Sequence, residues 1–117
     1  ALGQVKKLAT ITTIEADLDK YNLNFNKYDL IVNVNYLNRR LLPQIKEALK
    51  SGGVVMFETF IVAHGDFTQP SNPEFLLRKN ELLHAFIGLD VIYYEEKDDT
   101  NLRGEKTRVA SLVARKA

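Results

Sequence analysis

The stretch from Tyr28 to Phe60 constrains the fold of this chain most, because it has the pattern of a strand, a helix and a second strand. Tyr28 to Val32 is a short apolar run rich in β-branched residues, which predicts a strand buried on both faces. From Leu41 to Lys50 the apolar residues recur with helical spacing, and Gly52-Gly53 is predicted to end that helix. Val54 to Phe57 then predicts a second buried strand.

A strand, a crossover helix and a second strand predict a right-handed βαβ unit with parallel strands. In such sheets, ligands bind beyond the carboxyl ends of the strands. Those ends carry polar residues here, in Asn33 to Tyr36 and in Glu58 to Phe60. We therefore expect a site at this edge of the sheet.

The segments before and after this unit predict further elements. Residues 2–9 have helical spacing, and Thr10–Glu15 is short and β-branched, which predicts a strand. The segment Ile61 to Pro73 has no clear period, and loops of such length are usually functional or disordered. We expect it to be more mobile than the strands.

The carboxyl-terminal part predicts a helix and an antiparallel hairpin. The helix is expected from about Lys79, with Asn80 as its cap. Leu89–Tyr94 and Thr107–Arg115 are predicted strands, and the polar segment Glu95–Lys106 is predicted to be the loop between them. A parallel unit followed by a hairpin predicts a mixed α/β fold.

The composition is that of a globular protein with one domain, since 45% of the 117 residues are hydrophobic and 26% are charged. The net charge of +1 gives no electrostatic reason to expect nucleic acid or an acidic membrane as a partner. Without cysteine, disulfides and thiolate metal sites are excluded, and two histidines do not predict a metal site. No apolar run approaches a membrane span and no signal peptide is visible, so we expect a cytoplasmic protein.

Several short motifs occur in a fixed order along the chain. They are Thr12–Leu18, Tyr28–Val32, Asn35–Arg39, Ala48–Gly53, Glu58–Phe60, Asn72–Leu77, Glu81–Leu83 and Tyr94–Glu96. Together they resemble the class I S-adenosylmethionine-dependent methyltransferases, and within these the tellurite-resistance-type enzymes. The resemblance implies a Rossmann-like sheet whose strands run third, second, first, fourth, fifth, seventh, sixth. It also implies S-adenosylmethionine as the cofactor.

The start of the chain departs from this family pattern. The family's first strand, its glycine-rich cofactor loop and the acidic residue after its second strand would lie before Ala1, and no such loop is found in the chain. We therefore expect the carboxyl-terminal two thirds of such an enzyme. Strands without their neighbours predict a homo-oligomer that forms through exposed sheet edges. The chain alone is expected to have no methyltransferase activity.

The resemblance assigns cofactor contacts to Asp17, Leu18, Asn33 and Asn35. Asp17 and Leu18 match the position that meets adenine, although a turn carboxylate after a strand has the same pattern. Asn33 and Asn35 follow a strand where the family lines the methionine end of the cofactor. Asparagine is also common in turns, so local bonding to the backbone is the alternative for Asn35.

The predicted catalytic residues are Glu58 and Tyr36. Glu58 could act as a base or position the acceptor if burial raises its pKa, and the alternative is a structural carboxylate. Arg39 follows Tyr36 in a family-like Tyr-Leu-x-Arg, where it either binds an anionic acceptor or caps local carbonyls. The other predicted substrate-binding residues are Thr59, Phe60 and His64. The loop after Phe60 is expected to lie over the acceptor pocket.

Two functions remain open from the sequence. The first is a methyltransferase that acts on a small-molecule acceptor, of which this chain is a part. The second is a truncated relative that has lost catalysis and serves in binding or interaction. A different nucleotide-binding protein with a doubly wound sheet is a weaker third possibility. The sequence upstream of Ala1 would separate the first two, because the enzyme needs the glycine-rich loop.

Overall fold

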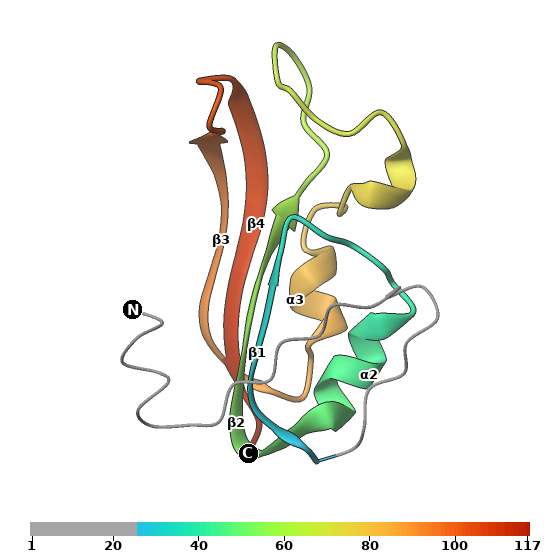
Figure 1. Ribbon diagram of the computed structural model, residues 1–117, viewed down its shortest axis with the longest axis vertical. Coiled ribbons are helices and arrows are strands. Elements are labelled where there is room, and N and C mark those ends of the chain that lie inside the picture. Colours follow the sequence, from blue (N-terminus) through green and yellow to red (C-terminus); the bar gives the residue numbers. More distant parts are fainter. Residues whose placement is uncertain (1–25) are drawn as a thin grey trace.

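The computed structural model describes residues 26–117, so the predicted helix in residues 2–9 and the predicted strand Thr10–Glu15 lie outside the described residues. The elements are β1 (Tyr28–Val34), α2 (Leu41–Ala48), β2 (Leu49–Phe60), η1 (Pro73–Phe75), α3 (Glu81–Ala85), β3 (Asp90–Thr100) and β4 (Lys106–Arg115). Figure 1 shows the strands side by side in a long sheet, with α2 and α3 against it.

The sheet has the order β1-β2-β4-β3. β1 and β2 are parallel, whereas β4 is antiparallel to both β2 and β3. Val32 lies opposite Met56 on β2, and Phe57 lies opposite Leu112 on β4. This is the fourth, fifth, seventh, sixth order that the family resemblance implied. The predicted fold, a parallel βαβ core followed by an antiparallel hairpin, is confirmed.

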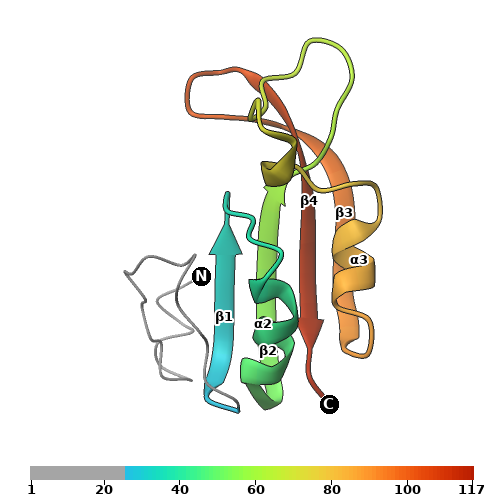
Figure 2. The same ribbon diagram turned by 90° about the vertical axis from the view of Figure 1, so that its right-hand side faces the viewer.

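The core lies between one face of the sheet and the helices. Figure 2 shows α2 and α3 in front of the strands, on the same side of the sheet. Helix α2 directs Leu42, Ile45 and Ala48 toward the sheet, as its helical spacing predicts. Phe57 on β2 and Phe86 after α3 meet in this layer, with ring centroids 5.8 Å apart.

The opposite face of the sheet is more exposed, which corrects the prediction that the first strand is buried on both faces. Val32 is 47% exposed and Val34 is 54% exposed, and Met56 on β2 is also exposed. Within residues 26–117 no helix covers this face, because α2 and α3 both pack on the other one. Since successive side chains of a strand point to opposite faces, only half of the run can be buried there.

The glycine pair does not end the helix as predicted. Helix α2 already ends at Ala48, and Leu49 has extended backbone. Gly52, with φ 81°, and Gly53 lie inside β2 instead. A Cβ at Gly53 would lie 2.9 Å from the carbonyl oxygen of Tyr28, so this glycine permits the close approach of β1 and β2.

The hairpin is longer and its loop shorter than predicted. Most of the polar segment Glu95–Lys106 is strand, and β3 continues to Thr100. The turn between the strands is closed by Asn101, whose side-chain Oδ1 accepts hydrogen bonds from the backbone N–H groups of Arg103 and Glu105. Charged residues can continue these strands for two reasons. Opposite charges pair across neighbouring strands. In addition, β3 lies at the edge of the described sheet, where charged side chains are common.

Helix α3 begins two residues later than predicted, at Glu81. Asn80 is its N-cap residue, but its φ of 62° is left-handed and its side chain makes no capping hydrogen bond. Its backbone N–H instead donates to Glu96 on β3, 2.8 Å away. The prediction of Asn80 as the cap is therefore right in position and wrong in mechanism.

Candidate functional site

The chain turns sharply at the carboxyl end of β1. Asn35 has a φ of 56°, and its backbone N–H donates to the carbonyl oxygen of Glu58 over 2.8 Å. The side-chain amide of Asn33 donates to the carbonyl oxygen of Tyr36 over 2.7 Å. Asparagine accepts left-handed backbone more readily than most residues, so this sequence suits the turn. The local side-chain bond to the backbone in this turn is made by Asn33, and Asn35 contributes the left-handed backbone.

The segment from Tyr36 to Arg40 connects this turn to α2. Asn38 donates from Nδ2 to the Tyr36 hydroxyl over 3.4 Å and accepts at Oδ1 from the backbone N–H of Arg40 over 3.1 Å. Leu37 is buried in the core beside them. The connection is therefore held by the buried side chain of Leu37 and by the hydrogen bonds of Asn38.

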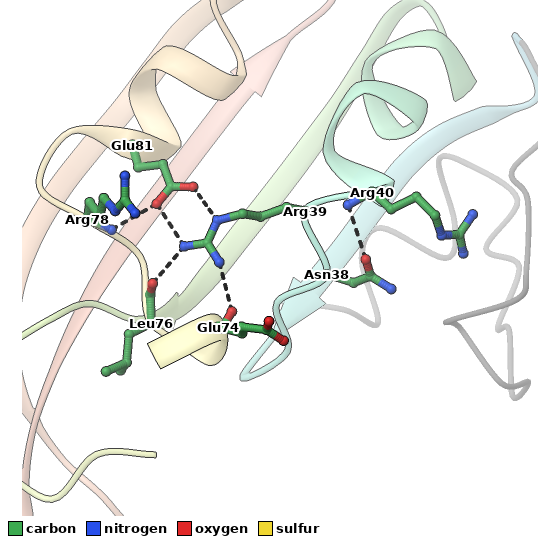
Figure 3. Close-up of polar contacts among 7 residues, drawn as sticks. All are labelled: Asn38, Arg39, Arg40, Glu74, Leu76, Arg78 and Glu81. Atoms are coloured by element: carbon green, nitrogen blue, oxygen red, sulfur yellow. Dashed lines mark hydrogen bonds and ion pairs between the residues drawn. The ribbon is translucent and has the colours of Figure 1, made fainter. Parts of the chain in front are cut away.

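Arg39 joins this connection to the segment around η1 and α3 (Figure 3). Its Nε donates to Oε2 of Glu81 over 2.7 Å, and its Nη2 donates to Oε1 of the same carboxylate over 2.9 Å. Its Nη1 donates to the carbonyl oxygen of Glu74, and its Nη2 also donates to that of Leu76. Every nitrogen of the guanidinium is engaged, in the fork geometry that arginine offers and lysine does not.

The Arg39–Glu81 pair shifts both pKa values in the directions that favour the ions. The hydrogen bonds between them raise the pKa of Arg39 and hold the pKa of Glu81 below the ordinary glutamate value. Glu81 also accepts from the backbone N–H of Arg78 over 2.9 Å. Because the side chains are 40% and 23% exposed, solvent weakens their attraction, and the geometry matters more than the charge.

A pocket of about 340 Å³ lies next to this pair. It is lined by Leu37, Asn38, Arg39, Arg40, Glu74 and Phe75. One wall is the β1–α2 connection, and the other is η1. The volume falls at the lower end of the range for small-molecule sites.

Glu58 lies away from this pocket. Glu58 lies two residues after Met56 in β2, so both side chains point to the same face, the one opposite the helices. There it accepts a hydrogen bond from the hydroxyl of Ser111 on β4, and the ammonium of Lys97 on β3 lies 3.9 Å from its Oε1. The structural alternative predicted bonds to loop amides, and the partners in the structure are side chains of neighbouring strands.

The loop after β2 is held at its base and near its middle. Ile61 forms a bridge with Leu77, which brings the two ends of the segment together. Near the middle of the loop, the backbone N–H of Thr68 donates to the carbonyl oxygen of Lys106 over 2.8 Å. The Lys106 ammonium lies 4.5 Å from the centre of the Phe67 ring, a cation–π contact. The irregular backbone of this loop is as expected, and its mobility stays a prediction.

The predicted site residues fall into separate groups. Asn33, Asn35 and Tyr36 share the turn after β1, and Arg39 lies beyond them in the pocket wall. The other predicted residues lie elsewhere: Thr59 is buried on the helix side of β2, Phe60 is half-buried on its other side, His64 is exposed in the loop, and Asp17 and Leu18 lie outside the described residues.

Sequence reasoning assigned no role to Glu74, Phe75 and Glu81, which complete the pocket wall and the ion pair. All three occur in motifs that carried the family resemblance, and that was the available signal. Their spacing gives no sign that they meet Arg39, because more than thirty residues separate them in the sequence.

Neither a metal-binding cluster of side chains nor a membrane-spanning helix is found in residues 26–117. No group of histidine, aspartate and glutamate side chains there is arranged to hold a metal ion. No helix in the same range is long and apolar enough to cross a membrane.

Comparison with solved structures gives strong matches to the whole described sheet. TehB from Haemophilus influenzae matches with a TM-score of 0.71 and 24% identity, over 99% of this chain and 44% of that chain. An S-adenosylmethionine-dependent methyltransferase from Mesorhizobium loti matches with a TM-score of 0.60 and 21% identity, over 98% of this chain and 75% of that chain. The fold is that of the S-adenosylmethionine-dependent methyltransferases.

A third structure with this fold contains a cofactor product. An N-methyltransferase from Haemonchus contortus, in complex with S-adenosylhomocysteine, matches with a TM-score of 0.57 and 15% identity, over 86% of this chain and 36% of that chain. This chain thus spans less than half the length of TehB and of the Haemonchus enzyme. No family model and no curated protein matches the sequence.

Proposed function

We propose that this chain is part of an S-adenosylmethionine-dependent methyltransferase that acts on a small-molecule acceptor. The observation that carries the proposal is the sheet order β1-β2-β4-β3, with one parallel pair followed by a reversed hairpin, which is shared with methyltransferases of known structure. In open α/β sheets the carboxyl ends of the strands bind ligands. The pocket next to the β1–α2 connection lies at that edge.

The cofactor would bind at the carboxyl end of β1. Asn33, Asn35 and Tyr36 lie there and bring amide and phenol groups, which can bind the carboxylate and ammonium of a methionine moiety. Asp17 and Leu18 remain the proposed adenine contacts. S-adenosylmethionine, when bound, supplies an activated methyl group on a sulfonium.

The residues of the chain would mainly align the acceptor and exclude water. Methyl transfer is an in-line displacement, in which the acceptor nucleophile forms a bond to the methyl carbon as the carbon–sulfur bond breaks. Such a step needs positioning more than acid–base side chains. Tyr36, at the end of β1, is placed beside the proposed cofactor site. Glu58, the other proposed catalytic residue, contacts Ser111 on the opposite face of the sheet, so a catalytic role for it would require an acceptor bound on that face.

Two observations support a small acceptor. The volume of the pocket, about 340 Å³, is that of a small-molecule site, and the net charge of +1 offers no field that would gather nucleic acid. Arg39 is part of the wall that shapes this pocket. Thr59, Phe60 and His64 do not line it, so their proposed contacts with the acceptor would require a site that extends beyond this pocket.

The test is methyl transfer from labelled S-adenosylmethionine by the protein that contains this chain, together with calorimetric titration of the cofactor. Asp17→Ala should weaken cofactor binding and leave the fold intact, because it removes an acceptor for the adenine amine. Asp90→Ala, which removes an exposed carboxylate at the start of β3, is the matched control. Cofactor binding without transfer to any acceptor would favour the alternative function, a methyltransferase-like protein that only binds. No cofactor binding at all would contradict the methyltransferase function and leave only an interaction role for the alternative.

We also propose that the chain associates with itself through the β1 edge of the sheet. Among the described residues β1 pairs only with β2, which leaves its outer backbone edge for pairing, and the exposed side chains of Val32 and Val34 on the adjoining face would add apolar contact. Sedimentation should give a dimer or larger species, which Val34→Lys should weaken. A stable monomer at micromolar concentration would contradict this proposal.

A further inference from the structure

We propose that the pocket between the β1–α2 connection and η1 binds small uncharged molecules that carry an aromatic ring. Arg39 holds the wall of this pocket in place, but its positive charge is neutralised and does not attract anions into the pocket. Calling the bound molecule the methyl acceptor rests on the proposed function. Binding itself does not require the cofactor and can be measured without it.

Arg39 is already neutralised within the protein. Its guanidinium donates to both oxygens of Glu81 and to the carbonyl oxygens of Glu74 and Leu76. An anionic ligand would have to displace a bidentate carboxylate that is covalently held nearby, and the raised pKa of Arg39 reflects how well that carboxylate is placed. Arg39 therefore does not attract an anion into the pocket.

The remaining charges of the described lining cancel. Arg40 is positive and Glu74 is negative, and both line the same pocket. An anion drawn to Arg40 would be repelled by Glu74, and a cation drawn to Glu74 would be repelled by Arg40. Charged molecules would also lose hydration on entry, and no unbalanced charge in the lining offsets that cost.

The apolar part of the lining is aromatic. Phe75 is 47% exposed, although large aromatic side chains usually gain free energy from burial. Phe75 and the buried Leu37 both line the pocket. A ligand ring that stacks on Phe75 would bury this exposed surface.

Arg39 fixes the position of that ring. Its bonds to the carbonyl oxygens of Glu74 and Leu76 lie on either side of Phe75 in the sequence. Asn72 holds the other end of η1, because its side chain accepts from the backbone N–H of Glu74 over 3.0 Å. Lysine in place of Arg39 keeps the charge but cannot make the fork, so the wall would loosen without a change in net charge.

The first experiment compares matched probes by chemical-shift titration of the isotopically labelled full chain. The probes are benzyl alcohol, benzoate, benzylamine, the zwitterion 4-(aminomethyl)benzoate, and cyclohexylmethanol as the non-aromatic control. Benzyl alcohol should shift the amide signals of Asn38 and Phe75 and bind at least about threefold more tightly than each other probe. A charged or zwitterionic probe that binds as tightly, or no shift at these signals with any probe, would overturn the proposal.

The second experiment separates the ring from its support. Phe75→Leu should weaken benzyl alcohol binding about threefold or more while amide exchange stays unchanged. Arg39→Lys should weaken binding and also speed the exchange of the Phe75 and Leu76 amides. Arg108→Lys is the matched control, since it alters the ion pair to Asp98 on the distant hairpin and should change neither property. Unchanged binding and exchange in Arg39→Lys would overturn the role of Arg39.

The experiments distinguish failure of this proposal from failure of the proposed function. If the pocket binds no aromatic probe but labelled methyl groups are still transferred, the acceptor binds elsewhere and the methyltransferase function stands. If benzyl alcohol binds at Phe75 and the protein shows no affinity for S-adenosylmethionine, the pocket is real and the proposed function is wrong.

Discussion

The two faces of the sheet are built differently. On the face covered by α2 and α3, β2 contributes side chains such as Val55 and Phe57, which are almost completely buried. On the other face the same strand contributes Met56, which is exposed, and Glu58, which contacts Ser111 and Lys97. One strand thus supplies an apolar core to one side and a mixed, partly polar surface to the other.

This difference shows where the described residues gain their stability. The covered face removes large apolar side chains from water, which is the dominant favourable contribution to folding. The other face holds an ion pair and hydrogen bonds that solvent can reach, and such contacts contribute little each. The pocket beside Arg39 lies at the rim of the covered face, between the β1–α2 connection and η1.

The largest expected effect separates the two faces directly. Phe57→Ala should lower the free energy of unfolding by about 3–5 kcal/mol, because it opens a cavity beside Phe86 that the core cannot fill. Met56→Ala, the neighbour on the exposed face, should cost about 1 kcal/mol or less. Urea unfolding followed by circular dichroism measures both. Equal losses for the two variants would contradict the contrast between the faces.

An intermediate effect tests the ion pair at the rim of the covered face. Glu81→Gln should lower the free energy of unfolding by about 1 kcal/mol at pH 7, because it removes the charge that holds Arg39. The pKa of Glu81 is lowered in the folded protein. The contribution of its charge to the free energy of unfolding is therefore fully present above the ordinary glutamate pKa of about 4.3. That contribution is lost as the pH falls through the lowered pKa.

The parent and the Glu81→Gln variant should therefore differ in urea stability at pH 7 and converge in strong acid. Glu47→Gln, on the exposed side of α2, is the matched control and should match the parent at pH 7. A difference between parent and Glu81→Gln that persists unchanged well below pH 4 would mean that the carboxylate charge does not stabilise this rim.

The smallest expected effect lies on the exposed face. Lys97→Met removes the ammonium that lies 3.9 Å from Glu58 and should change the free energy of unfolding by about 0.5 kcal/mol or less. The same urea measurement, at low and at high salt, should show little dependence on salt. A loss above about 1 kcal/mol would show that the contacts of Glu58 stabilise the sheet more than their exposure suggests.

Much of the fold could be predicted because it rests on local patterns. The apolar run Tyr28–Val32, the helical spacing after Leu41 and the β-branched run before Arg115 each identify an element, and the order of elements predicts the parallel pair and the hairpin. The ends of elements were harder to predict. Gly52 and Gly53 have the pattern of a helix end, and the approach of β1 placed them inside a strand instead.

The candidate site could be predicted only in part, because only some of it rests on local sequence patterns. The polar turn after β1 follows from sequence, because asparagines at the end of a buried strand predict a turn at the ligand-binding edge. The sequence alone thus determined the α/β fold and that edge. Only the tertiary structure decided that Arg39 meets Glu81, that Phe75 lines a pocket and that Glu58 faces the opposite side. Contacts between residues far apart in sequence depend on how loops cross a finished sheet, and no local pattern encodes that crossing.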